Sequence, residues 1–203
     1  MPPQPEVFIF DCFGVLFDFD VQILYSRLEP YCSSPKGGFS LETVLAVPEL
    51  VTGHRTLAEH HAFMRETYGL TLDYEDFVQA WTQPYSWPMP GMAELLNTLA
   101  ASYPLLLLSN IDAYYWRAIR PLHDELNLFK ALLLSCNLGL AKPDPEIFVH
   151  AVAVTGTASE RCFFIDDTLR NVEVARDAGL QTHWFRGAAG LREELLRLNV
   201  RGL

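Results

Sequence analysis

Five short runs of apolar residues stand out along the chain, and none of them alternates apolar with polar positions. They are VFIF (7–10), LLLLS (105–109), ALLLS (131–135), CFFI (162–165) and THWF (182–185). Each run has the length of a β-strand, and unbroken apolar runs are typical of strands that are buried on both faces of a parallel sheet. The pattern therefore predicts a parallel sheet built from these runs.

Helical patterns lie just before and between the last four of these runs. Residues 90–100 place the following apolar side chains on one face: Met92, Leu95, Leu96 and Leu99. Residues 145–154 follow Asp144, a favourable N-cap, and residues 168–178 end at Gly179, the residue type that commonly follows a helix. The alternation of strands and helices predicts an α/β fold with a doubly wound parallel sheet.

One interval breaks this alternation. More than 90 residues separate the first run from the second, far more than an ordinary crossover needs. Residues 18–87 contain several helical patterns, the best of them at 56–68 and 75–83, and no clear buried strand. We therefore expect an α/β core formed by residues 1–17 and 88–203, with residues 18–87 inserted as a helical cap over the edge of the sheet where ligands bind.

Composition and charge narrow the classes of function. Half of the 203 residues are apolar, which excludes a mostly disordered chain, and the formal charge of −10 makes nucleic acid and anionic membranes poor partners. The cysteines form no CxxC pair, so we expect reduced thiols in a cytoplasmic protein. The first residues lack a secretory signal and no apolar run is long enough for a bilayer, so we expect no membrane span.

Polar residues follow the ends of the predicted strands: Asp11, Ser109, Asn110, Lys142, Asp166 and Asp167. If the strands are parallel neighbours, these side chains converge at one edge of the sheet. The carboxylates would repel one another unless a cation lies among them, and ligands that are all oxygen suit Mg²⁺. The other groups, together with the start of the helix at 145–154, could hold a phosphate beside the metal.

Asp11 is the best candidate for a nucleophile. A carboxylate can attack a phosphoryl group and form an acyl phosphate, which divides one displacement into two easier steps. His60 and His61 do not suggest a zinc site, because adjacent residues on a helix point about 100° apart. We expect both histidines on a polar face of the cap.

Four segments resemble, in order, the four motifs of the haloacid dehalogenase-like (HAD) hydrolase superfamily. They are FDCFGVLFD (10–18), LLLLSN (105–110), GLAKPDPEIF (139–148) and FFIDDTLRNVEVARDAGL (163–180). The resemblance covers nearly the whole chain, and the insertion is similar to the small helical cap of that superfamily. Within it, GHRTLAEHHAF (53–63) and the chain length are most similar to sugar-phosphate phosphatases that resemble glucose-1-phosphatase.

The resemblance implies a role for each strand-end residue. Asp11 would be the nucleophile and a Mg²⁺ ligand, and the backbone carbonyl of Phe13 would be a second ligand. Asp167 would complete the metal site, with Asp166 acting directly or through water.

The same resemblance implies a phosphate site. Ser109 and Asn110 would bind the transferring phosphoryl group. Lys142 would neutralise the charge that builds up near Asp11, and Asn171 would orient the acidic pair.

One position departs from the pattern of the superfamily. Phe13 stands where most of its phosphatases have an aspartate that protonates the leaving group, a contribution worth roughly 10²- to 10⁴-fold in rate. Asp18 and Asp20 lie nearby in sequence as candidate replacements. The haloacid dehalogenases proper carry an aromatic residue at this position and work without metal, but they usually lack the Asp166–Asp167 pair.

Three hypotheses follow. The leading one is a Mg²⁺-dependent phosphomonoesterase that acts on small phosphorylated metabolites, with sugar phosphates as the class that the resemblance suggests. The second is a 2-haloacid dehalogenase that forms an ester on Asp11. The third is a protein of the same fold that has lost turnover and binds a phosphorylated ligand or a partner. Metal binding separates the first hypothesis from the second.

Overall fold

The computed structural model describes residues 3–33, 39–40 and 47–203. Its core is a parallel sheet in the order β5-β4-β1-β6-β7. The strands are β1 (Val7–Phe10), β4 (Leu105–Ser109), β5 (Ala131–Leu134), β6 (Cys162–Asp166) and β7 (Gln181–Trp184). All pairings between neighbours in this sheet are parallel. The prediction of a parallel sheet built from the apolar runs is confirmed.

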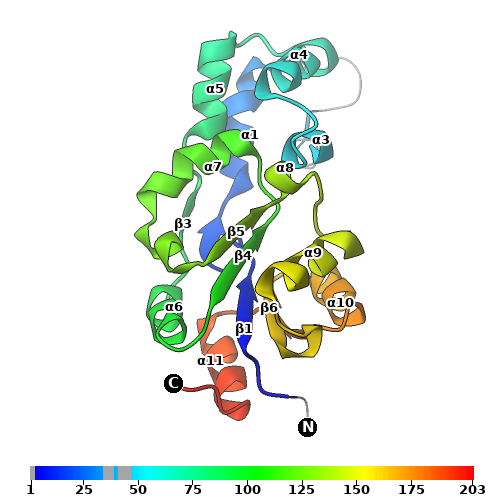
Figure 1. Cartoon of the computed structure of the whole chain (residues 1–203). Coiled ribbons are helices and arrows are strands. Elements are labelled where there is room, and N and C mark those ends of the chain that lie inside the picture. Colours follow the sequence, from blue (N-terminus) through cyan, green and yellow to red (C-terminus); the bar gives the residue numbers. More distant parts are fainter. Residues whose placement is uncertain (1–2, 34–38, 41–46) are drawn as a thin grey trace.

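Helices cover both faces of this sheet (Figure 1). One face packs against α6 (Met92–Ala100), α7 (Ala113–Ile119) and α11 (Ala188–Arg197), and the other packs against α9 (Pro145–Thr155) and α10 (Leu169–Asp177). A short helix, α8 (Ser135–Leu138), follows β5. Short 3₁₀ helices occupy the following segments: Glu29–Tyr31, Arg120–Leu122, Asp124–Leu128 and Ser159–Arg161.

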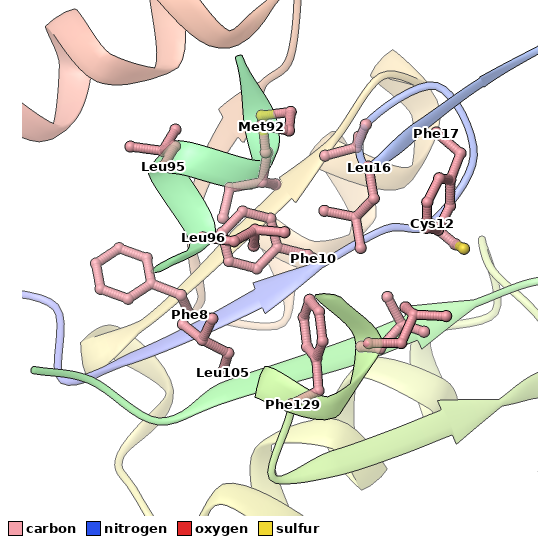
Figure 2. Close-up of a cluster of buried hydrophobic side chains, with 14 of the residues drawn as sticks. Phe8, Phe10, Cys12, Leu16, Phe17, Met92, Leu95, Leu96, Leu105 and Phe129 are labelled. Atoms are coloured by element: carbon pink, nitrogen blue, oxygen red, sulfur yellow. The ribbon is translucent and has the colours of Figure 1, made fainter. Parts of the chain in front are cut away.

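The central strand β1 shows why its sequence is apolar without alternation. Phe8 and Phe10 belong to the cluster beneath α6 and α11, and Val7 and Ile9 belong to the cluster beneath α9 and α10. Each of these side chains is at most 3% exposed, since both faces of the strand are covered. Figure 2 shows the first cluster, in which Phe10 lies among side chains from α6 and the ring of Phe129, just before β5.

The caps of the predicted core helices are also present. Asp144 accepts a hydrogen bond from the backbone N–H of Glu146, 2.9 Å away, at the start of α9. Gly179 follows the end of α10 with a φ of +91°, a conformation that favours glycine.

The inserted segment forms a second cluster of helices beyond the ends of β1 and β4 (Figure 1). It contains α1 (Val21–Leu28), α3 (Pro48–Val51), α4 (Leu57–Tyr68) and α5 (Tyr74–Thr82). A separate group of buried apolar side chains, from Leu24 to Trp81, holds these helices together. This separate core supports the proposal that residues 18–87 form a cap domain.

The sequence analysis missed two short, largely unburied strands at the ends of this segment. β2 (Phe17–Phe19) and β3 (Ser86–Pro88) form a small antiparallel ladder. Its pairs, such as Phe17 with Pro88, join the two points where the chain leaves and re-enters the core. The ladder connects three-residue segments that are far apart in sequence, so no local pattern reveals it.

The expectation that His60 and His61 lie on a polar face is also wrong. Both are buried in the cap, at 1% and 7% exposure. His61 Nε2 forms a hydrogen bond with the Leu72 carbonyl, 2.9 Å away, while His60 packs edge-on against Trp81. Burial lowers the pKa of His60 to about 4, so its ring is neutral at pH 7 and packs as an aromatic group.

No helix in the described ranges is both long enough and apolar enough to cross a bilayer.

Candidate functional site

The carboxyl ends of three adjacent strands bring the site together. Asp11 directly follows β1, Ser109 ends β4 and Asp166 ends β6, and β1 lies between the other two strands. The backbone N–H of Asp11 donates to the Ile165 carbonyl over 2.9 Å, which extends the β1–β6 pairing by one residue. The chain therefore places Asp11 beside Asp166, as the strand-end pattern predicted.

Lys142 joins these two aspartates. Its Nζ lies 2.7 Å from Asp11 Oδ1 and 2.7 Å from Asp166 Oδ2. The lysine side chain is 1% exposed and the Asp166 side chain is fully buried. Burial by itself lowers the pKa of Lys142, but the two carboxylates outweigh burial and raise it above the ordinary value, so the ammonium stays charged.

The two carboxylate oxygens of Asp11 differ in their contacts. Its Oδ1 accepts from the backbone N–H of Cys12 over 2.6 Å and also faces Lys142. Within the described ranges these contacts all fall on Oδ1, so Oδ2 is available for attack. Burial raises the pKa of Asp11 to about 7, and the adjacent Asp166 adds to this shift while Lys142 opposes it. A bound cation would stabilise the ionised form that a nucleophile requires.

Asp166 has a different environment from Asp167. Its Oδ1 accepts from the backbone N–H of Thr168 over 2.8 Å, and Asn171 Nδ2 lies 3.1 Å from each of its oxygens. Together with Lys142 these donors occupy both oxygens. The sequence-based inference that Asn171 orients the acidic pair agrees with this geometry for Asp166.

Asp167 stands at the open side of the site. Trp184 Nε1 donates to its backbone carbonyl over 2.8 Å. The turn at Gly14, with a φ of +78°, passes so close that a Cβ there would lie 2.2 Å from Asp167 Oδ2. Glycine is therefore required at position 14 both by the backbone conformation and by the space that the carboxylate needs.

Asn110 has a partner that the sequence did not reveal. Its Nδ2 donates to the Lys142 carbonyl over 2.7 Å, and its Oδ1 accepts from the Lys142 backbone N–H over 2.8 Å. This paired contact fixes the backbone of the lysine loop to the end of β4. No sequence signal indicates it, since the two residues are 32 positions apart.

Ser109 lies deeper than expected for a phosphate ligand. Its side chain is fully buried, and its Oγ has no hydrogen-bond partner among the residues that the structure describes. Its predicted contact with a phosphoryl group stays a prediction.

A cavity of about 190 Å³ opens above these residues. Asp11, Lys142, Asp167 and Phe13 line it, and Asn110 and Asn171 contribute to its wall. Asp18 and Asp20 are not among its described lining residues. Asp20 instead caps α1 by accepting from the backbone N–H of Gln22, and Asp18 accepts from its neighbour Phe19. Neither carboxylate is placed to replace the missing acid at Phe13.

The donor set of the site suits a hard divalent cation. One carboxylate oxygen from each of Asp11, Asp166 and Asp167 lies within 4.8 Å of the other two. Among the residues that the structure describes, Lys142 is the only cation within ion-pair distance of Asp11 or Asp166, and one ammonium cannot balance three carboxylates. Oxygen ligands with excess negative charge fit Mg²⁺.

Comparisons with known proteins find phosphatases among the relatives of this chain. The D-ribitol-5-phosphate phosphatase of Bacteroides thetaiotaomicron is 27% identical over 156 residues, which are 72% of this chain and 74% of that protein. The flavin mononucleotide hydrolase 1 of Arabidopsis thaliana, described as chloroplastic, is 32% identical over 136 residues, 65% of this chain. The chain spans about half of that protein's length (54%).

The fold is shared with solved structures of the same kind. A HAD family enzyme of Bacteroides thetaiotaomicron, solved with magnesium and inorganic phosphate, matches 91% of this chain and 96% of its own. Its TM-score is 0.77 at 24% identity. The family model of the haloacid dehalogenase-like hydrolases matches residues 5–179, a range that includes every strand-end residue of the site. The chain therefore belongs to the haloacid dehalogenase-like hydrolase family.

Proposed function

We propose that this hydrolase is a Mg²⁺-dependent phosphomonoesterase of small phosphorylated metabolites. The observation that carries the proposal is the placement of Asp11, with Oδ1 held by Lys142 and Cys12 and Oδ2 left over, in a cavity that it shares with Asp167. The phosphatases among its relatives support the same reaction class. Sugar phosphates as the substrates, and a cytoplasmic location, stay predictions.

In this proposal Asp11 Oδ2 attacks the phosphorus atom and the ester P–O bond breaks. The products of this step are an aspartyl phosphate and an alkoxide, and the alkoxide takes a proton from water. A water molecule then attacks the phosphorus and releases phosphate and free Asp11. Lys142 keeps Asp11 ionised and oriented, and offsets the negative charge that gathers beside it.

The remaining residues position these groups. Asp11, the Phe13 carbonyl and Asp167 would hold Mg²⁺, which when bound supplies positive charge toward the phosphate oxygens. Asp166, whose oxygens are already occupied, would act on the metal through water while it anchors Lys142. Ser109 and Asn110 would complete the phosphate end, with Asn110 also holding the lysine loop.

The test of this function is hydrolysis of a panel of phosphomonoesters with Mg²⁺ and with a chelator. We expect phosphate release with Mg²⁺, and its loss in the chelator with recovery when excess Mg²⁺ is restored. Phosphate release that is equally fast in the chelator would contradict the metal in the proposal. No release from any ester would contradict the phosphatase.

Asp167→Asn is expected to weaken Mg²⁺ binding by roughly tenfold or more, because a hard anionic ligand becomes a neutral amide. The dissociation constant for Mg²⁺ is measured by titration calorimetry. Asp177→Asn, at an exposed position near the end of α10, is the matched control and should bind Mg²⁺ like the wild type. Equal affinity in both variants would remove Asp167 from the metal site.

Because Phe13 cannot act as a general acid, we predict that kcat/KM depends steeply on the leaving group. An alkoxide that must be expelled without a general acid leaves slowly, whereas a nitrophenolate leaves without help, so kcat/KM should fall as the pKa of the leaving alcohol rises. Phe13→Asp should raise activity on the poorest leaving groups and have little effect on the best. A flat series, with chemistry shown to limit the rate, would reveal a hidden acid.

Dehalogenation is the second candidate, and Phe13 is the observation that favours it. Phe13 places an aromatic ring in the wall of the cavity that Asp11 lines, which would suit an apolar carbon–halogen group. The surplus of carboxylates over Lys142 argues against a reaction without metal. Chloride release from a 2-chlorocarboxylic acid in the chelator would favour this candidate.

A further inference from the structure

A second, larger cavity lies between the cap and the core. Its volume is about 480 Å³, within the usual range for small-molecule sites. It shares Phe13, Phe19, Asn110 and Lys142 with the cavity of Asp11, so the two cavities adjoin. A group bonded to a phosphate at Asp11 would therefore extend into the larger cavity.

Aromatic rings form one continuous wall of this cavity. The ring of Phe13 meets Phe19 edge-on at 5.7 Å between centroids and meets Tyr115 at 5.9 Å. Tyr115 in turn stacks on Tyr85 at 4.3 Å, and Trp81 adds a ring from the cap. Phe13 is thus the start of an apolar wall that runs from the nucleophile into the cap.

Almost all the polar side chains that line the cavity are hydrogen-bonded to other groups of the protein. Asp112 is 8% exposed; its Oδ1 accepts from the backbone N–H groups of Tyr114 and Tyr115, and its Oδ2 accepts from Trp81 Nε1. The Tyr115 hydroxyl accepts from the Tyr85 backbone N–H and contacts the Ser86 hydroxyl. Among the described lining residues, the Tyr85 hydroxyl is the exception.

We infer that the alcohol of the substrate is apolar, so that this hydrolase acts on phosphate monoesters of hydrocarbon-like alcohols, aliphatic or aromatic. The inference rests on the proposed function. A sugar would bury several hydroxyls against a wall whose polar side chains, apart from the Tyr85 hydroxyl, are already hydrogen-bonded within the protein, whereas each methylene removed from water there adds affinity. This inference is an alternative to the sugar phosphates that the family resemblance suggested. One set of substrates distinguishes the two hypotheses.

The decisive substrates are straight-chain alkyl phosphates from ethyl to octyl, measured with Mg²⁺. Their alcohols have nearly the same pKa, so the effect of the leaving group stays constant along the series. We expect kcat/KM to rise by roughly three- to fourfold for each added methylene until the cavity is full. Hexyl phosphate should exceed a hexose 6-phosphate by roughly 100-fold or more. A flat series, or a faster sugar phosphate, would overturn the inference.

Variants of Val51 test whether the cavity carries this preference. Val51 lines the cavity from α3 and takes no part in the phosphate end. Val51→Asn should lower kcat/KM for octyl phosphate by roughly tenfold and leave ethyl phosphate unchanged, while Val51→Ala, which stays apolar, should lose much less. Val149→Asn, at a 63% exposed position on α9, is the control and should match the wild type. Equal effects of Val51→Asn on both esters would place the alkyl chain elsewhere.

Binding of alkyl phosphonates, which cannot be hydrolysed, separates this inference from the proposed function. Affinity that rises with chain length, together with no hydrolysis of any ester, would keep the apolar cavity as a ligand site and reject the phosphatase. Hydrolysis with no effect of chain length in either assay would keep the phosphatase and reject the apolar alcohol. A loss of the chain-length effect on phosphonate affinity in Val51→Asn alone would support the cavity directly.

Discussion

Replacing Asp11 by asparagine is expected to reduce kcat for phosphomonoester hydrolysis by roughly 10³-fold or more, because an amide cannot attack phosphorus and form the aspartyl phosphate. The fold should survive, since asparagine keeps an oxygen for the Cys12 N–H and Lys142 retains Asp166 as its partner. The measurement is phosphate release under saturating Mg²⁺, with the melting temperature of each variant recorded beside it.

Asp20→Asn is the matched control for this variant. It makes the same chemical change at an exposed N-cap of α1, where asparagine caps a helix as well as aspartate does. Its kcat should equal that of the wild type, which would also exclude Asp20 as a hidden acid. If Asp11→Asn retains more than a few per cent of wild-type kcat, another residue performs the chemistry.

Replacing Lys142 by methionine is expected to reduce the free energy of unfolding by about 3–5 kcal/mol, because it leaves Asp11 and Asp166 buried and unpaired. Methionine keeps an unbranched chain of similar length, so most of the effect is electrostatic. The measurement is urea unfolding in a chelator, since a divalent cation would replace part of the missing charge. Turnover should also be lost, as Asp11 loses the group that orients it.

Lys130→Met is the control for this change. Lys130 is exposed just before β5, and its replacement should alter stability by less than about 0.5 kcal/mol. A double variant, Lys142→Met with Asp166→Asn, should regain part of the lost stability without regaining activity, because it removes one of the two facing charges. If Lys142→Met unfolds at the same urea concentration as the wild type, the buried charge network described above is wrong.

Local sequence patterns were sufficient to predict the sheet and the approximate position of the candidate site. A strand covered on both faces must be apolar at every position, so VFIF at 7–10 and LLLLS at 105–109 could be recognised without a template. Parallel strands end at one edge, and this geometric rule placed Asp11 and Asp166 together before any distance was known.

Contacts between distant segments had no such local signature. The β2–β3 ladder joins residues some 70 positions apart, and the paired contact of Asn110 with Lys142 spans 32 positions. The histidines of α4 looked polar in sequence, yet a neutral imidazole packs against Trp81 in the core of the cap. In each case the partner determines the environment, and the partner is absent from the local sequence.

The sequence by itself determined the family, the order of the core strands along the chain and which carboxylates lie near Asp11, because the motifs and the apolar runs are local patterns. Only the tertiary structure decided what each of these groups touches. It tied both oxygens of Asp166 to Lys142, Asn171 and Thr168, left Asp167 open to the cavity, and made Phe13 the first ring of an apolar wall. Those distinctions depend on three-dimensional contacts within the core and, for Phe13, with the cap, and many of the partners lie far away in the chain.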